Sequence, residues 1–218
     1  MSLQSFLFVV YMAVGLLIAL LAHELAHGWL AVRLGDQSPR MMRRLTLDPR
    51  AHLDPFGSLL LPGILLLPVL FGQPLFPVFA YAKPMPVNPW NLRRRERDAV
   101  LIALAGPAAN VVLAFAFGAL FRLAANGPVQ PALFVAANLQ VNVVMAVMQL
   151  VPIPSLDGSR VLARFLPARA REVYTGLDPY AALFILVVFF IIPGPVGAFV
   201  RVVGNGVCGL VAGGACIG

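Results

Sequence analysis

The chain has 218 residues, of which 60% are hydrophobic and 11% are charged, and its mean hydropathy is +0.88. These few polar residues cannot cover the surface of a water-soluble globular protein. The composition therefore excludes a soluble enzyme and indicates an integral membrane protein. The net charge of +7 does not indicate nucleic-acid binding, because most Lys and Arg lie in short loops beside apolar segments.

The first apolar segment covers about residues 6–34 and exceeds the ~20 residues that a membrane-spanning helix needs. Gly35 and Asp36 follow its basic end and predict a helix stop. Arginines gather around the loop that comes next, and the positive-inside rule makes this loop cytoplasmic and places the uncharged N-terminus outside. They are Arg33, Arg40, Arg43, Arg44 and Arg50.

The second apolar stretch, about residues 56–81, is interrupted by prolines and glycines, and a second arginine cluster follows at residues 93–97. If both basic clusters are cytoplasmic, the chain enters and leaves on one side, so we expect a re-entrant element over about residues 56–90. A pair of short crossings would meet the same condition. The end of this element, residues 78–88, is rich in β-formers and prolines, which predicts a short β-hairpin or an edge strand.

Three further spans are expected at about residues 99–124, 133–151 and 180–200. The turn between the first two of these is uncharged, as expected outside, and the loop after residue 151 is rich in arginine, as expected inside. We therefore expect an all-α membrane protein, with residues 1–218 forming a single domain of about four spans plus the re-entrant element. Cys208 and Cys216 do not have the spacing of a metal site, although they could form a disulfide.

The sequence HELAH, residues 23–27, lies near the end of the first span. On a helix, His23 and His27 are about 40° apart around the axis and ~6 Å apart along it, so their rings can meet one ion. Glu24 lies ~100° from His23 and is better placed to touch a water molecule on that ion. This is the zincin arrangement, in which Zn²⁺ activates water and Glu is the general base. The alternative, two ordinary histidines and a chance Glu, is disfavoured because charged groups are costly in an apolar helix.

A catalytic zinc needs a third protein ligand, and Asp157 is the most attractive candidate. Pro152 and Pro154 end the preceding span at the expected depth of the HELAH sequence, and Gly158 lets the backbone turn so that the carboxylate points inward. Asp157 could instead only cap the short helix that follows it. The other candidates are His52, Asp36, Asp48 and Asp54.

Three ordered motifs, HELAH, AGPAAN (residues 105–110) and VPIPSLDG (residues 151–158), resemble the site-2 protease family of intramembrane zinc metalloproteases. The stretches LDPFGSLLLPG and AKPMPVNPWNLR further resemble its small bacterial members, which lack PDZ or CBS domains. The resemblance covers about residues 22–164. It implies His23, His27 and Asp157 as Zn²⁺ ligands and Glu24 as the catalytic base.

The sequence departs from the family pattern at Gln149, where the family usually has Asn. The side-chain amide of Gln149 could donate a hydrogen bond to the oxyanion, and it has one more methylene than Asn. Asn142, two turns earlier, is expected to form an interhelical hydrogen bond. In AGPAAN we favour close helix packing against the HELAH helix, with Asn110 able to bond across it.

The expected function is therefore the hydrolysis of peptide bonds in or near transmembrane helices of membrane-protein substrates. The expected partners are such a substrate and the lipid bilayer, without nucleic acid, and the expected location is a bacterial cytoplasmic membrane with the active site toward the cytoplasm. There are two alternatives: an inactive family member that acts as a membrane scaffold, and a zinc transporter. A transporter would place polar residues through several spans, whereas here they gather at one depth.

Overall fold

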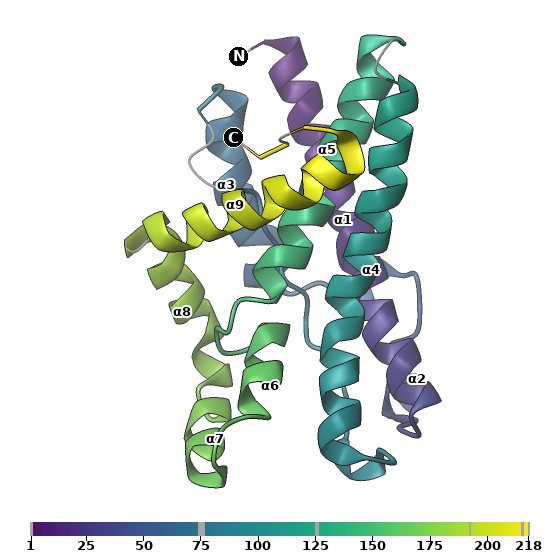
Figure 1. Cartoon of the computed structure of the whole chain (residues 1–218), viewed down its shortest axis with the longest axis vertical. Coiled ribbons are helices and arrows are strands. Elements are labelled where there is room, and N and C mark those ends of the chain that lie inside the picture. The colour runs from purple at the N-terminus through teal and green to yellow at the C-terminus, as the bar shows by residue number, and fades with distance from the viewer. Residues whose placement is uncertain (1, 74–76, 125–126, 192, 215, 218) are drawn as a thin grey trace.

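The computed structural model describes residues 2–73, 77–124, 127–191, 193–214 and 216–217, and these residues form helices and loops without any strand (Figure 1). Within these ranges, four helices are long and apolar enough to cross a membrane. The α-helices are α1 (Leu3–Arg33), α2 (Ser38–Met41), α3 (Leu61–Leu70), α4 (Arg95–Ala124), α5 (Val129–Gln149), α6 (Asp157–Ala163), α7 (Ala168–Thr175), α8 (Ala181–Leu186) and α9 (Pro193–Ala212).

The centre of the molecule is a bundle of α1, α4 and α5 (Figure 1). In the most apolar part of α5, 61% of the residues are buried, against 28% in α1 and 33% in α4, so α5 is the central helix. Small residues allow the helices to approach closely. A Cβ at Gly15 of α1 would lie 3.1 Å from the side chain of Asn138 in α5.

Residues 55–70 run up beside the bundle and residues 77–90 run back down (Figure 1), a course that a re-entrant element and a pair of short crossings share. The ascending limb is a π-helical stretch, Pro55–Leu60, followed directly by α3. The returning limb, residues 77–88, is extended and is fixed by hydrogen bonds to the start of the element. The backbone N–H of Tyr81 donates to the Gly57 carbonyl at 3.0 Å, and the Ser58 hydroxyl donates to the Tyr81 carbonyl at 2.7 Å.

The β-hairpin or edge strand predicted for residues 78–88 is wrong for the residues that the structure describes. Prolines at 77, 84, 86 and 89 remove backbone N–H donors at intervals along the limb. The remaining backbone groups make isolated hydrogen bonds instead of a ladder, such as that from the Lys83 N–H to the His52 carbonyl at 2.8 Å.

The last part of the chain differs from the single span expected at residues 180–200. The structure has α8 and a π-helical stretch, Val187–Ile191, followed by the separate helix α9, and the spanning-length helix is Gly194–Ala212. The Pro-Gly-Pro sequence at residues 193–195 explains the break. Proline has no backbone N–H, so two hydrogen bonds of a continuous helix cannot form here. Figure 1 shows α9 running across the long helices rather than along them.

The C-terminal tail folds back on α9. Cys208 forms a disulfide with Cys216, and the Asn205 side chain donates to the Ile217 carbonyl at 2.9 Å and accepts from its N–H at 2.9 Å. α9 ends against the later turns of α4, where a Cβ at Gly118 would lie 2.8 Å from Val211. The disulfide therefore lies beside the half of α4 that is far from its arginine-rich start.

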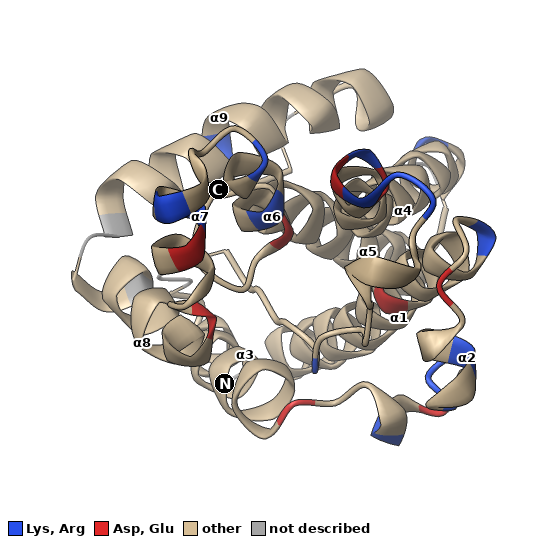
Figure 2. Ribbon diagram, turned by 90° about the horizontal axis from the view of Figure 1, so that it is seen from below, with Lys and Arg blue, Asp and Glu red and all other residues tan. Residues whose placement is uncertain are grey.

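Charged residues gather at the opposite end of the bundle. Figure 2, seen from this end, shows Lys and Arg on α2, at the start of α4 and on α6. Arg122 of α4 and Arg201 of α9 lie outside these clusters. The long helices thus carry an asymmetric charge distribution of the kind that orients membrane proteins.

Candidate metal centre

Helix α1 presents His23, Glu24 and His27 toward the interior of the bundle, where all three side chains are buried. The two imidazoles point toward each other, with 2.9 Å between their Nε2 atoms. One ligand atom from each of the three residues can be chosen so that all lie within 4.8 Å of one another. The one-turn spacing of the histidines thus brings their rings together, as the helical repeat predicts.

Helix α4 fixes the orientation of both imidazoles through residues four positions apart, Ile102, Gly106 and Asn110. The Nδ1 atom of His27 lies 2.6 Å from the Ile102 carbonyl oxygen, and that of His23 lies 2.7 Å from the Asn110 Oδ1 atom. Both oxygens are acceptors, so each Nδ1 carries the donated proton. Each neutral ring then has a free lone pair on Nε2. This tautomer is the one that can bind a metal through Nε2.

Gly106 lies directly opposite the pair of imidazoles. A Cβ at this position would collide with Nε2 of both His23 and His27. The absence of a side chain on α4 therefore keeps the space in front of the two nitrogens open.

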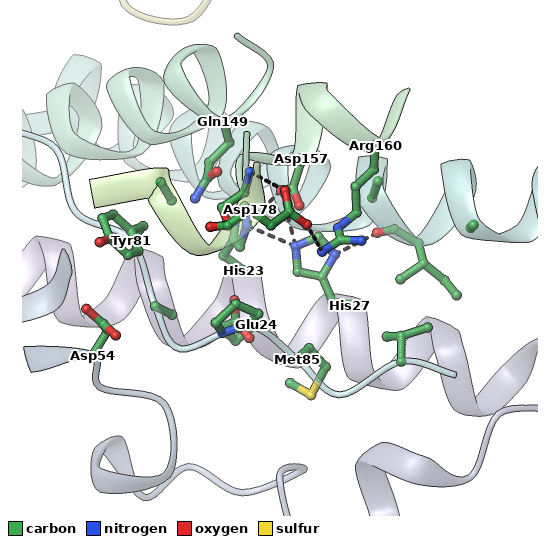
Figure 3. Close-up of a pocket in the computed structure, with 18 of the residues that line it drawn as sticks. His23, Glu24, His27, Asp54, Tyr81, Met85, Gln149, Asp157, Arg160 and Asp178 are labelled. Atoms are coloured by element: carbon green, nitrogen blue, oxygen red, sulfur yellow. Dashed lines mark hydrogen bonds and ion pairs between the residues drawn. The ribbon is translucent and has the colours of Figure 1, made fainter. Parts of the chain in front are cut away.

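Asp157 approaches the same point from the start of α6. Its Oδ2 atom lies 3.0 Å from Nε2 of His23 and 3.2 Å from Nε2 of His27. Helix α6 has no side-chain hydrogen bond at its N-cap, which is Leu156, so the structure does not show the capping role considered for Asp157. Figure 3 shows the carboxylate directed at the two imidazoles.

The three converging atoms fit a zinc ion. Their separations of 2.9, 3.0 and 3.2 Å approach the roughly 3.3 Å edge of a tetrahedron with zinc-ligand bonds of about 2.0 to 2.1 Å. Two unprotonated nitrogens and a carboxylate oxygen would repel one another without a cation. The donor set of two imidazoles and one carboxylate is also that of several catalytic zinc sites.

Three of the other candidate ligands, Asp36, Asp48 and Asp54, hold loops instead. Asp48 accepts from the Arg50 N–H, and Asp54 accepts from the N–H groups of Phe56 and Gly57. Asp36 accepts four hydrogen bonds from residues 38, 88 and 91. Burial opposes the ionisation of Asp36, but these hydrogen bonds outweigh it and lower its pKa.

The remaining candidate, His52, also has a structural contact. Its Nε2 atom is hydrogen-bonded to the Thr46 carbonyl at 2.9 Å. Its ring is buried in the loop below the re-entrant element. Among the five candidates, Asp157 is therefore the one that contacts both histidines.

The loop that delivers Asp157 is held by α7 and by the segment that follows it. Asp178 accepts at 3.0 Å from the Ser155 N–H through its carboxylate and at 3.0 Å from the Ser155 hydroxyl through its backbone carbonyl. The Tyr174 hydroxyl donates to the Pro152 carbonyl at 2.8 Å. Ser155 has a φ of 70°, a left-handed conformation that these contacts maintain.

A cavity of about 450 Å³ lies in front of the converging atoms. Glu24 lines it, and its Oε2 atom is buried without a hydrogen-bond partner among the described residues. Gln149 lines the cavity from the end of α5, as Figure 3 shows, and residues 81–87 of the extended limb form another wall. A reacting group in the cavity would thus meet a carboxylate and an amide beside the candidate metal ligands.

The partner of His23 also belongs to a buried chain of amides. Asn110 donates at 3.1 Å to the Ala19 carbonyl and at 3.1 Å to Oδ1 of Asn142. The interhelical hydrogen bond predicted for Asn142 is thus present. From AGPAAN we favoured a packing role for this segment. The structure adds a second role for Asn110, which contacts the candidate ligand His23. The signal that could have found it is the spacing of residues 102, 106 and 110 on one helix face.

Curated proteins provide relatives over most of this chain. The protein named "Putative zinc metalloprotease YwhC" in Bacillus subtilis (strain 168) is 32% identical over 198 residues, which are 87% of this chain and 83% of that protein. "Putative zinc metalloprotease Rip2" of Mycobacterium tuberculosis (strain ATCC 25618 / H37Rv) is 33% identical over 177 residues, which are 80% of this chain and 64% of that protein. No family model and no solved structure matches the chain.

The relatives are named zinc metalloproteases, this chain carries a buried His-Glu-His cluster, and four of its described helices are long and apolar enough to cross a membrane. The chain belongs to the site-2 protease family of intramembrane zinc metalloproteases.

Proposed function

We propose that this protein is a zinc-dependent intramembrane endopeptidase that hydrolyses peptide bonds in or near transmembrane helices of membrane-protein substrates. The observation that carries the proposal is the convergence of Nε2 of His23, Nε2 of His27 and Oδ2 of Asp157. The proton-bearing Nδ1 atoms of both rings face away from that point. These three side chains would hold the ion, and zinc when bound supplies Lewis acidity to a water molecule and to the scissile carbonyl.

Glu24 is the proposed general base. Glu24 lines the cavity beside the candidate ligands, and its Oε2 atom has no hydrogen-bond partner among the described residues, so the carboxylate can take a proton from the attacking water. The water oxygen forms a bond to the carbonyl carbon, the carbon-nitrogen bond breaks, and Glu24 returns the proton to the leaving amine. Gln149 is the proposed oxyanion donor, because its amide also lines the cavity.

The substrate of such a site is a locally unwound helix, because the peptide groups of an intact helix are hydrogen-bonded to one another. Residues 81–87 of the extended limb border the cavity. An unwound segment could lie along this wall with its scissile bond at Glu24.

We further propose that the protein lies in a bacterial cytoplasmic membrane with the cavity toward the cytoplasm. His27 precedes the basic end of α1 at Arg33 by six residues, or about 9 Å of helix. The arginine-rich loops gather at that same end. Water can therefore reach the site over a short distance from the cytoplasmic side.

The test uses purified protein in detergent and a model transmembrane substrate. The wild type is expected to bind one zinc per chain and to cleave the substrate. Glu24→Gln should retain zinc but lose at least about 100-fold in rate, as expected when a general base is removed. Asp157→Asn should lose zinc. Full activity of Glu24→Gln would refute the mechanism, and full zinc content of Asp157→Asn would show that the third ligand is elsewhere.

A further inference from the structure

Arg44 differs from the other arginines of the loop between α1 and the re-entrant element. Arg40, Arg43 and Arg50 are exposed, as expected of residues that orient a membrane protein, whereas Arg44 is buried. Removing a guanidinium from water is unfavourable unless it is paired. A role in setting topology does not require this burial, so the contacts of Arg44 need another explanation.

The local backbone directs Arg44 toward α1. Arg43 has a φ of 54°, and the Arg44 N–H donates to the Pro39 carbonyl at 2.9 Å, so the chain reverses direction here. The next residue, Leu45, packs where α1 has no side chain, because a Cβ at Gly28 would lie 2.7 Å from Cδ2 of Leu45. The loop is thus seated against α1 one turn beyond Glu24.

The guanidinium of Arg44 joins two walls of the cavity. Its Nη2 atom donates to the Lys83 carbonyl at 2.7 Å and lies 3.9 Å from Oε2 of Glu24. The second distance is too long for a hydrogen bond, so Arg44 acts on Glu24 through charge attraction. Oε2 of Glu24 and Nε of Arg44 are both buried without hydrogen-bond partners among the described residues.

We propose that Arg44 is a positioning residue that holds the Glu24 carboxylate and the extended residues 77–88 in a fixed relation. The inference rests on the proposed function, in which Glu24 is the general base and residues 77–88 border the bound substrate. Through Lys83, Arg44 sets the position of the substrate wall, and through its charge it sets the position of the carboxylate. It contacts neither the candidate metal ligands nor the scissile bond.

The first test is a double-mutant cycle that does not depend on activity. The melting temperatures of the wild type, Arg44→Met, Glu24→Gln and the double variant are measured in detergent, with Arg40→Gln as the matched control. Each single change leaves a buried partner unpaired, so the double variant should lose less than the sum of the two single losses. Arg40→Gln should match the wild type. Additive losses would overturn the pairing of Arg44 with Glu24.

The second test measures zinc content and substrate cleavage. Arg44→Met is expected to retain one zinc per chain, to lower kcat at least 10-fold, and to change KM by less than about threefold. Arg44→Lys keeps the charge and should recover part of the lost kcat, which a purely structural role would not predict. If Arg44→Met reduces zinc content, or raises KM alone, the positioning role is wrong. If the wild type binds zinc but cleaves nothing, the proposed function fails, and the double-mutant cycle still decides whether Arg44 and Glu24 are coupled.

Discussion

Asn110 accepts a hydrogen bond from Nδ1 of His23 at 2.7 Å, and its own amide protons are committed to Ala19 and Asn142. The amide cannot turn around without losing these contacts, so Asn110 determines which nitrogen of His23 faces Asp157. An outer partner of this kind is worth about 10- to 100-fold in metal affinity.

Asn110→Ala should therefore weaken zinc binding by about 10- to 100-fold, because His23 loses the acceptor that fixes its tautomer. Competition with a chromogenic chelator measures this affinity. Asn142→Ala is the graded control, since it removes a partner of Asn110 but not that of His23, and it should weaken binding less. Equal zinc affinity of Asn110→Ala and the wild type would show that the Ile102 and Asp157 contacts suffice.

Gly106→Ala should abolish zinc binding while the helices still form. The added Cβ would collide with Nε2 of both His23 and His27, so the rings must move apart or α4 must move away. Gly63→Ala in α3 is the matched control, because a Cβ there meets nothing within 4 Å. Zinc content by mass spectrometry and helicity by circular dichroism check the pair. Normal zinc content in Gly106→Ala would mean that α4 is not the wall described here.

Asp36→Asn should lower the melting temperature at neutral pH. The carboxylate accepts hydrogen bonds at both oxygens, so an amide placed there turns its NH₂ group toward a donor whichever way it faces. Because folding lowers the pKa of Asp36, its stabilising effect is complete above the ordinary Asp pKa of about 3.9 and is lost as the pH falls through the folded-state value.

Thermal unfolding of Asp36→Asn and the wild type is therefore compared from pH 7 downward. The difference between the two proteins should be constant from pH 7 to about 5 and should shrink below about pH 4. A difference that does not change over this range would show that the charge of Asp36 contributes nothing.

Asp178→Ala should lower the zinc affinity without changing any candidate ligand. It removes the carboxylate that holds the Ser155 N–H, and so loosens the loop that delivers Asp157. Glu172→Gln on neighbouring α7 is the control, because it also removes a carboxylate but at an exposed position. The chelator competition applies again, and hydrogen exchange of residues 152–158 should rise only in Asp178→Ala. Unchanged exchange would mean that Tyr174 and the backbone carbonyl of residue 178 suffice to hold the loop.

The sequence predicted the candidate site well because polar and charged residues are costly in an apolar helix and therefore stand out. The pair His23 and His27 lies one helical turn apart, and Asp157 lies after two prolines that end α5, so local rules and topology together brought them to one depth. The basic clusters on both sides of residues 56–90 led to the expectation that this stretch enters and leaves the membrane on one side.

Other features depend on contacts that no local pattern contains. Arg44 lies among exposed arginines in the sequence, and only the folded loop shows that it alone is buried beside Glu24. The extended limb was predicted as a strand because its residues favour extended backbone, but its prolines prevent a ladder. The span expected at residues 180–200 ignored the Pro-Gly-Pro sequence, which ends one helix and lets α9 cross the bundle.

The disulfide between Cys208 and Cys216 carries information about the whole molecule. Disulfides persist in oxidising compartments and are rare in the reducing cytoplasm of mesophiles. The pair lies beside the later turns of α4, whereas the arginines gather around the start of that helix. Oxidation chemistry and charge distribution are unrelated signals, and both agree with the proposed orientation, in which the cavity faces the cytoplasm.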